Sequence, residues 1–333
     1  MADLTNSAEI EKQTEFFFNR LQKRYKHLKK WAKRTNTGCF RLYDKDIPEI
    51  PLAVDIYNSV DNDERCGLYA HIFLYERPYE KDQEEELNWL AIMQNTVSKA
   101  LAIPTEHIFT KIKKRQKGES AQYEKLTEKH FCITVNEAGI LFKINLSDYL
   151  DTGLFFDHRP LRTLIRQTCA EKSVLNLFCY TGSFSCYAAA GNAKSVDSVD
   201  LSNTYLQWTK DNFKLNGLSI SNCNFIQSDA VSFIESAIKK QKKWDIIVLD
   251  PPTFSNSKRM NDFFDINHCW DTLVNNCLKL LFPDGILYFS TNSRKLKFDS
   301  ELINGTVQDI TCSTIPEDFR NTRIHRCWKI CNP

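Results

Sequence analysis

A short apolar run that ends in a turn with a single glycine constrains this chain more than any other feature. The run is Val174–Leu177, the turn is Phe178–Gly182, and the small and aromatic residues of Phe184–Ala190 follow. A glycine lets the backbone approach a ligand closely, and the residues after it are compatible with a helix. A strand, a glycine turn and a helix in this order predict a nucleotide site in an α/β fold.

The turn has neither of the glycine patterns that hold a pyrophosphate or a triphosphate. A dinucleotide fold uses G-x-G-x-x-G and a phosphate loop uses G-x-x-x-x-G-K-[ST], whereas Gly182 stands alone. S-adenosylmethionine has no phosphate, so one glycine is enough for it. We therefore predict S-adenosylmethionine as the cofactor. A dinucleotide-dependent oxidoreductase is the alternative, and the missing glycines speak against it.

Two acidic residues at the ends of later strands fit other parts of this cofactor. Asp200 ends the run Ser195–Asp200, about 20 residues after the first turn, where a carboxylate takes ribose hydroxyls in such folds. Asp229 follows a third run and is placed to meet the adenine amino group. A plain turn aspartate is the alternative for Asp200. The predicted cofactor contacts beside these two residues are Leu201, Ser202 and Ala230.

The most specific motif follows the apolar run Trp244–Leu249. It reads Asp250, Pro251, Pro252, Thr253 and Phe254. Two prolines cannot continue a central strand, so they predict a rigid loop at its carboxyl end, where open α/β sheets bind ligands. We predict that Asp250, Pro251, Pro252 and Phe254 form the catalytic loop, with Asp250 also contacting the cofactor.

Helix and strand patterns alternate over residues 148–333 and predict a doubly wound, mostly parallel sheet. A turn is expected at Pro283–Gly285, before a fifth strand at 286–290. The last two strands, at 306–310 and 324–330, are expected to form a reversed hairpin at the sheet edge.

The amino-terminal part predicts a separate α+β domain that binds RNA. Alternating patterns over residues 39–74, a helix at 82–102 and a hairpin at 131–144 place this domain at 38–147. A basic helix precedes it, at about 8–35, in a segment assigned to residues 1–37. The apolar stripe of this helix is predicted at Phe18, Leu21, Tyr25, Leu28 and Ala32.

Two basic segments with interleaved aromatic residues predict RNA contacts. The first is the exposed face of the amino-terminal helix, with Tyr25 and Trp31 beside the lysines, and the second is the loop after residues 108–112, with Tyr123 beyond it. A solvated helix face and ordinary packing are the alternatives. The predicted RNA-binding residues in these segments are Lys23, Lys26, Lys30, Arg34, Lys111, Lys113, Lys114, Arg115 and Lys117.

Composition limits the remaining functional classes. Charged residues make up 26% and the formal net charge is +2, so any nucleic-acid surface must be local. The twelve cysteines include no C-x-x-C pair, so no metal site is predicted. The amino terminus has no apolar segment of a signal peptide, and no apolar run reaches about 18 residues. We expect a reduced, cytoplasmic protein without a membrane span.

The segment between the two predicted domains is expected to touch the cofactor. Asp157 and Arg159 can pair with the methionine ammonium and carboxylate of S-adenosylmethionine. The alternative is an ion pair between the domains.

Three stretches resemble a known family: Asn145–Gly153, Asn176–Gly182 and Asp250–Met260. They are similar to the RlmK family, the half of the bifunctional bacterial enzyme RlmKL that methylates guanine N7 in 23S ribosomal RNA. The likeness spans about residues 18–330, and it implies a Rossmann-like class I methyltransferase domain with a seven-stranded, mostly parallel sheet at residues 148–333. It implies 23S ribosomal RNA or a large-subunit precursor as the partner, and Asp250–Phe254 as the site of the target base. It also implies cofactor contacts at Asn176, Phe178, Tyr180, Thr181, Gly182 and Ser183, and RNA contacts at Lys258 and Arg259.

The chemistry that this resemblance implies needs positioning more than it needs a base. Guanine N7 has an in-plane lone pair and attacks the methyl group without losing a proton. Asp250 is expected to accept from the guanine N1 or N2 hydrogens, and Phe254 to stack on a flipped base.

Other functions stay open at this point. The same loop suits guanine N2 or adenine N6. Cytosine C5 would need a cysteine after the fifth strand, and Phe289–Ser293 has none. A ribosome-assembly factor that binds RNA without catalysis is a further alternative. The chain shows no counterpart of the family's second half, with its RNA-binding THUMP domain and guanine-N2 activity, which leaves room for a separate unwinding partner.

Overall fold

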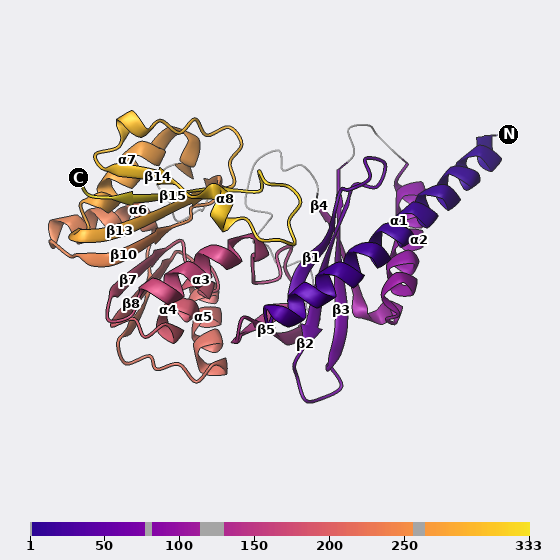
Figure 1. The fold of residues 1–333 in the computed structure, drawn as a ribbon, viewed down its shortest axis with the longest axis horizontal. Coiled ribbons are helices and arrows are strands. Elements are labelled where there is room, and N and C mark those ends of the chain that lie inside the picture. The colour runs from indigo at the N-terminus through magenta and orange to yellow at the C-terminus, as the bar shows by residue number, and fades with distance from the viewer. Residues whose placement is uncertain (1, 77–81, 114–129, 256–263) are drawn as a thin grey trace. The chain divides into compact units, whose positions relative to one another are not determined.

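The computed structural model describes residues 2–76, 82–113, 130–255 and 264–333, which form two compact units, Met1–Thr152 and Gly153–Pro333 (Figure 1). The boundary lies five residues after the predicted one at 147. The amino-terminal helix belongs to the first unit, because its apolar face is part of that unit's core.

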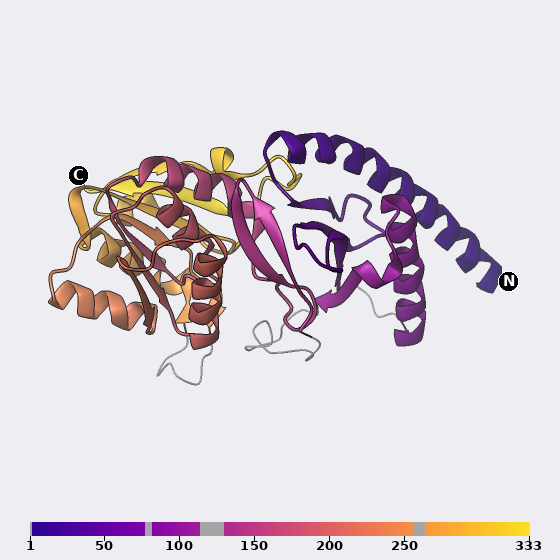
Figure 2. The ribbon, with the colours of Figure 1, turned by 90° about the horizontal axis from the view of Figure 1, so that it is seen from below.

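In the first unit, two helices pack on one face of a six-stranded sheet (Figure 2). The strand order is β4-β3-β2-β5-β6, with β1 beside β2, and among the described pairs only β3 and β4 run parallel. The elements are α1 (Ala2–Arg34), β1 (Cys39–Asp44), β2 (Leu52–Ser59), β3 (Gly67–Tyr75), α2 (Gln83–Leu101), η1 (Thr105–His107), β4 (Ile108–Lys113), β5 (Cys132–Glu137) and β6 (Ile140–Asn145). The predicted α+β arrangement is confirmed.

The apolar stripe of α1 packs on the sheet, and it includes Trp31. Leu21 and Leu28 are fully buried, and Trp31 is 6% exposed with its ring edge-on to Phe40. Tyr25 stacks on the same Phe40 ring at 6.4 Å between centroids. The prediction that Trp31 stands among the lysines as a base-stacking side chain is therefore wrong, because a residue three positions after Leu28 shares the buried face.

The second unit is a seven-stranded sheet with helices on both faces, as predicted. Its strand order is β14-β15-β13-β10-β7-β8-β9. Helices α3, α4 and α5 cover one face, and α6 and α7 cover the other (Figure 1). The elements are η3 (Phe156–His158), α3 (Arg159–Thr168), β7 (Ser173–Leu177), α4 (Ser183–Ala190), β8 (Ser195–Asp200), α5 (Asn203–Leu215), β9 (Cys223–Gln227), α6 (Ala230–Lys239), β10 (Trp244–Leu249), β11 (Phe254–Ser255), β12 (Phe264–Asp265), α7 (Ile266–Leu278), β13 (Leu281–Thr291), η4 (Ser300–Leu302), β14 (Thr306–Asp309), α8 (Thr311–Thr314) and β15 (Arg326–Cys331).

The reversed final hairpin is confirmed. Strand β15 runs antiparallel to both β13 and β14 and lies between them, whereas β9, β8, β7, β10 and β13 are parallel neighbours. The predicted turn at Pro283–Gly285 lies inside β13. There the register with β10 jumps from Trp244 opposite Leu281 to Ile246 opposite Ile286, so the turn residues bulge out without ending the strand.

No helix among the described residues is long and apolar enough to cross a membrane.

Candidate cofactor and methyl-transfer site

Three strand ends meet at one edge of the second unit's sheet. Leu177 at the end of β7 lies opposite both Val199 in β8 and Leu249 in β10. Because these strands are parallel, the glycine turn, Asp200 and Asp250 all leave the sheet at the same edge. The sequence motifs that predicted a nucleotide site are thus brought together by the parallel register.

The turn after β7 is wound tightly against α5. Phe178, Tyr180 and Gly182 all have positive φ, at 55°, 51° and 74°. A Cβ atom on Gly182 would lie 2.1 Å from Cγ2 of Thr209, so only glycine fits this position without a shift. The first turn of α4 begins directly afterwards, at Ser183.

Asp200 ties the turn to the next helix. Its carboxylate accepts from the backbone N–H of Tyr180 at 2.9 Å and of Ser202 at 2.8 Å. Burial raises the pKa of Asp200 to about 6, although the backbone donors act in the opposite direction. A carboxylate accepts more hydrogen bonds than these backbone donors supply, which suits the ribose hydroxyls of the predicted cofactor.

Several predicted cofactor residues have structural partners of their own. Asp229 caps α6 by accepting from the backbone N–H of Ser232 at 2.8 Å. Asn176 donates to Ser185 at 2.9 Å inside the sheet–helix interface, and the Thr181 hydroxyl donates to the carbonyl of Gly153 at 2.5 Å. Among the remaining predicted cofactor residues, Phe178 packs on Phe264, Ser202 caps α5, Ala230 is buried in α6, and Leu201 is half-buried.

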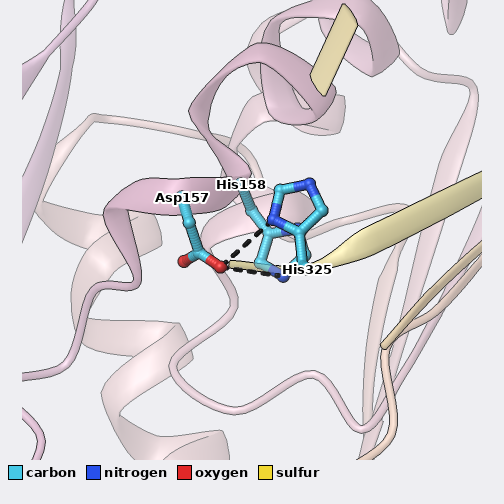
Figure 3. Close-up of side chains that lie close together, drawn as sticks. All are labelled: Asp157, His158 and His325. Carbon is cyan, nitrogen blue, oxygen red and sulfur yellow. Dashed lines mark hydrogen bonds and ion pairs between the residues drawn. The ribbon is translucent and has the colours of Figure 1, made fainter. Parts of the chain in front are cut away.

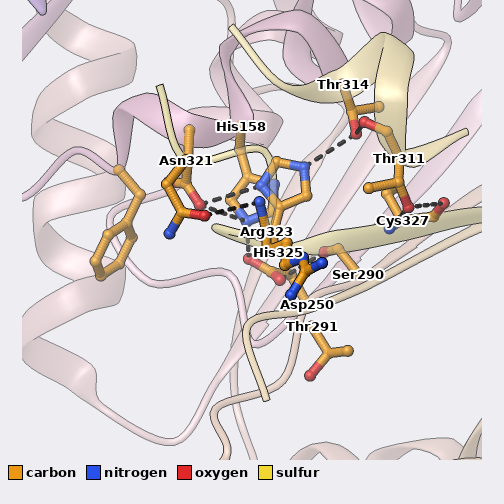
Figure 4. Close-up of polar contacts among 12 residues, drawn as sticks. His158, Asp250, Ser290, Thr291, Thr311, Thr314, Asn321, Arg323, His325 and Cys327 are labelled. Atoms are coloured by element: carbon orange, nitrogen blue, oxygen red, sulfur yellow. Dashed lines mark hydrogen bonds and ion pairs between the residues drawn. The ribbon is translucent and has the colours of Figure 1, made fainter. Parts of the chain in front are cut away.

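Asp250 is held from two sides at the end of β10. The Ser290 hydroxyl of β13 donates to Oδ1 at 2.5 Å, and Nε2 of His158 lies 3.2 Å from Oδ2. Figure 4 shows the carboxylate with Ser290 and His158 around it. Further along the loop, Thr253 donates to Asn292 at 2.8 Å, and the Phe254 side chain is 49% exposed. The loop is thus held by side-chain contacts at Asp250, whereas the Phe254 ring is partly exposed to solvent.

Asp157 and Arg159 are paired inside the second unit. Asp157 accepts from His325, and Arg159 donates to Asp318 at 2.9 Å. Both residues of the Arg159 pair are buried, so this guanidinium is turned to Asp318 and not to a ligand surface. His158, Ser290 and His325 were missed by the sequence analysis. Only His158 had a local signal, since it stands between Asp157 and Arg159.

The predicted RNA-binding residues fall into three groups. Lys23, Lys26, Lys30 and Arg34 are exposed on α1, opposite its buried stripe. Lys111 is buried, which lowers its pKa, and it donates to the carbonyl of Ser147. Its assignment to RNA is therefore wrong. Lys113 ends β4, and the residues outside the described ranges are Lys114, Arg115, Lys117, Lys258 and Arg259.

Two cysteines lie close to this edge of the sheet, and neither is poised as a nucleophile. Cys179 is in the glycine turn and Cys327 lies opposite Ser290 in the β13–β15 pair. Burial, reinforced by Asp200 for Cys179 and by Asp250 for Cys327, raises the pKa of both thiols well above the usual value. A thiol that stays protonated cannot add to a pyrimidine ring, so cytosine-C5 chemistry is disfavoured.

The chain is similar to known proteins over most of its length. A protein-family model described as S-adenosylmethionine-dependent methyltransferase matches residues 68–321. The ribosomal RNA large subunit methyltransferase K of Neisseria meningitidis is 44% identical over 316 residues, which cover 94% of this chain and 86% of that protein. The chain belongs to this family of S-adenosylmethionine-dependent methyltransferases.

The family includes longer proteins. The ribosomal RNA large subunit methyltransferase K/L of Methylococcus capsulatus is 43% identical over 323 residues, which cover 96% of this chain but only 43% of that protein. The predicted resemblance and the predicted cofactor are confirmed.

Solved structures agree on the fold. SMU.776 complexed with SAH has a TM-score of 0.71 at 22% identity, with 95% of this chain and 81% of that chain covered. The SAM-dependent methyltransferase from Agrobacterium tumefaciens has a TM-score of 0.58 at 21% identity, with 85% and 88% covered. Both share the fold of this chain.

Proposed function

We propose that this protein transfers the methyl group of S-adenosylmethionine to N7 of a guanine in 23S ribosomal RNA or its large-subunit precursor. The observation that carries the proposal is the Asp250–Phe254 loop, which leaves β10 beside the glycine turn, with an anchored carboxylate and an exposed aromatic ring. The printed names of the relatives support ribosomal RNA of the large subunit as the substrate. The enzyme would then act in the cytoplasm, and twelve free cysteines are consistent with a reducing compartment.

The loop performs the steps that N7 methylation requires. The cofactor supplies an electrophilic methyl group on its sulfonium. Asp250 accepts from the N1 or N2 hydrogens of the guanine, and Phe254 stacks on the base, so that N7 faces the methyl group. No side chain has to take a proton from N7, and orientation with exclusion of water accounts for most of the acceleration.

Exposed cations at the same edge suit an RNA backbone. Arg294, Lys295 and Lys297 follow β13 directly, and Arg323 precedes β15, whose first residues pair with the end of β13. The exposed lysines of α1 add a second basic surface in the other unit. Cationic side chains that contact phosphates position the nucleic acid but do not read its bases. These residues therefore support RNA as the substrate without indicating a particular sequence.

Nucleoside mass spectrometry tests the proposal directly. The protein is incubated with labelled S-adenosylmethionine and undermodified 23S ribosomal RNA, and the digest is expected to contain 7-methylguanosine. Asp250→Ala should abolish the product while the fold persists. Asp284→Ala is the matched control, because Asp284 is an exposed aspartate towards the opposite end of the sheet.

Other products separate the alternatives. N2-methylguanosine or N6-methyladenosine would keep the fold and the cofactor site but replace the target atom. Cofactor binding with no RNA product, on naked RNA and on precursor particles, would favour an assembly factor or the need for an unwinding partner.

A further inference from the structure

Two histidines from distant parts of the second unit lie stacked beside the catalytic loop. His158 ends η3 and His325 lies just before β15, and their ring centroids are 4.6 Å apart at an interplanar angle of 12°. Their side chains lie together with Asp157 in Figure 3. Both histidines are buried, at 6% and 1% exposure. Buried imidazole nitrogens need partners, so the partners of each nitrogen define what the pair does.

The partners of His325 fix the position of its ring. Its Nδ1 lies 3.2 Å from Oδ2 of Asp157, and its Nε2 lies 3.0 Å from the hydroxyl of Thr314. That hydroxyl has one hydrogen and donates it to the carbonyl of Thr311 at 2.9 Å. Both ring nitrogens of His325 therefore have a partner, and the ring is held between Asp157 and Thr314.

Asp157 is the ionised carboxylate of this cluster. Burial opposes its ionisation, but His158, His325 and Arg162 outweigh burial and hold the pKa of the carboxyl far below its usual range. The charge on Asp157 is therefore fixed at neutral pH.

His158 connects Asp157 and His325 to Asp250. Its Nε2 lies 3.2 Å from Oδ2 of Asp250 and 3.8 Å from Oδ2 of Asp157. An ionised carboxylate only accepts hydrogen bonds, so the contact of Nε2 with the nearer oxygen is favourable when Nε2 carries a hydrogen. The other nitrogen, Nδ1, has no hydrogen-bond partner in the described part of the chain. A hydrogen there would be a buried donor without an acceptor, so Nε2 is the nitrogen that faces a charged partner.

We propose that Asp157, His325 and His158 form a positioning relay, which fixes the direction of the Asp250 carboxylate for methyl transfer. His325 holds the His158 ring by stacking, and Asp157 lies beside it. The ring in turn holds Oδ2 of Asp250, while Ser290 holds Oδ1. None of the three touches the base, so they are positioning residues. The relay rests on the proposed function, because it takes Asp250 as the residue that contacts the guanine.

A metal ion is the competing explanation for this cluster. Asp157, His158 and His325 each offer a ligand atom, and these atoms lie within 4.8 Å of one another. A histidine ligand points its nitrogen lone pair at the metal in the plane of the ring. Two rings stacked at 12° have nearly parallel planes, so one ion cannot lie in both. The geometry favours hydrogen bonds over coordination.

A pair of substitutions separates positioning from packing. His158→Phe keeps an aromatic ring against His325 but removes the N–H donor, whereas His158→Gln loses the ring but keeps an amide donor at similar reach. His158→Phe should slow single-turnover methyl transfer by about 10- to 100-fold, because small misplacements of a contact group have effects of that size. Its dissociation constant for S-adenosylmethionine should stay within about twofold of the wild-type value, and His158→Gln should recover part of the rate.

A spectroscopic readout tests the relay without any activity. The full chain has seven histidines, and ring-nitrogen NMR of histidine-labelled protein reports which nitrogens carry hydrogen. His158 should carry a hydrogen on Nε2, and Asp250→Asn should shift the His158 signals most.

Each failure has a distinct meaning. A His158 hydrogen on Nδ1, unchanged His158 signals in Asp250→Asn, or about one equivalent of bound transition metal per chain would overturn the relay. Wild-type rates in His158→Phe would overturn it too, even if 7-methylguanosine were formed. If the proposed function is wrong, the wild-type protein will form no 7-methylguanosine, while the NMR pattern remains as expected.

Discussion

Replacing Gly182 by alanine tests whether the turn after β7 needs glycine because of its backbone or because of its neighbour. A non-glycine residue in the left-handed region costs roughly 1–2 kcal/mol. The new Cβ would also lie 2.1 Å from Cγ2 and 2.7 Å from Oγ1 of Thr209. Forcing an extra carbon into a packed interior costs about 1–3 kcal/mol more.

Thr209 has little freedom to move away. It is fully buried in α5, and its hydroxyl lies 2.9 Å from the carbonyl of Tyr205 and 3.2 Å from that of Tyr180. The clash is therefore expected to displace the turn itself. Since Tyr180 also donates to Asp200, the change should weaken cofactor binding as well as the free energy of unfolding.

Gly217 provides a matched control. It has a φ of 62°, and a Cβ atom there would meet nothing within 4 Å. Gly217→Ala therefore has the free-energy cost of the left-handed backbone without that of a clash. Calorimetry should show Gly182→Ala melting lower than Gly217→Ala by roughly 2–12 °C, from about 1–3 kcal/mol at 2–4 °C per kcal/mol in a unit of this size. Titration with S-adenosylmethionine should show weaker binding only for Gly182→Ala. Equal melting temperatures and equal affinities in the two variants would refute the reasoning.

Three further changes have expected outcomes. The pKa of Asp200 is raised to about 6 in the folded protein, so affinity for S-adenosylmethionine should rise as the pH rises through about 6. The free energy of unfolding of the second unit should fall between pH of about 4 and 6, because the folded state binds the proton more tightly than the unfolded state. A calorimetric pH series measures both trends, and Asp200→Asn should abolish them. Trp31→Ala should lower the free energy of unfolding by about 3–5 kcal/mol in a denaturant titration, without changing RNA affinity of the folded protein. Replacing Lys23, Lys26, Lys30 and Arg34 by alanine should weaken RNA binding and flatten its salt dependence, whereas replacing the exposed Lys239 and Lys240 should do neither; unchanged salt slopes in filter-binding assays would remove α1 from the RNA surface.

Local signals predicted the fold of the second unit well. Apolar runs of strand length separated by helix patterns are enough for a doubly wound sheet, because each crossover must return to a parallel neighbour. The glycine turn, Asp200 and Asp250 were placed together for the same reason, since residues after parallel strands share one edge. The bulge at Pro283–Gly285 was missed, because proline, aspartate and glycine indicate a turn regardless of whether the strand resumes its register.

The two errors among the predicted RNA contacts have different origins. The burial of Trp31 could have been predicted, since it follows Leu28 by three residues and so shares the apolar face of α1. The burial of Lys111 could not have been predicted from the local sequence. It depends on Ser147, which is far away in sequence and accepts the ammonium hydrogen bond only because the chain turns back after β6. A basic run predicts exposure on average, but it does not show which lysine a strand turns inward.

The relay beside Asp250 follows from the direction of the last strand. His325 and Asp157 are 168 residues apart, so no local pattern connects them. Strand β15 runs antiparallel to β13, with Arg326 opposite Thr291, and its first residues therefore lie at the carboxyl end of β13. Since β10 and β13 are parallel, that end is also where Asp250 leaves the sheet. A parallel final strand would begin at the opposite edge and carry His325 away from Asp250, so the reversed hairpin is what brings a second histidine to the catalytic loop.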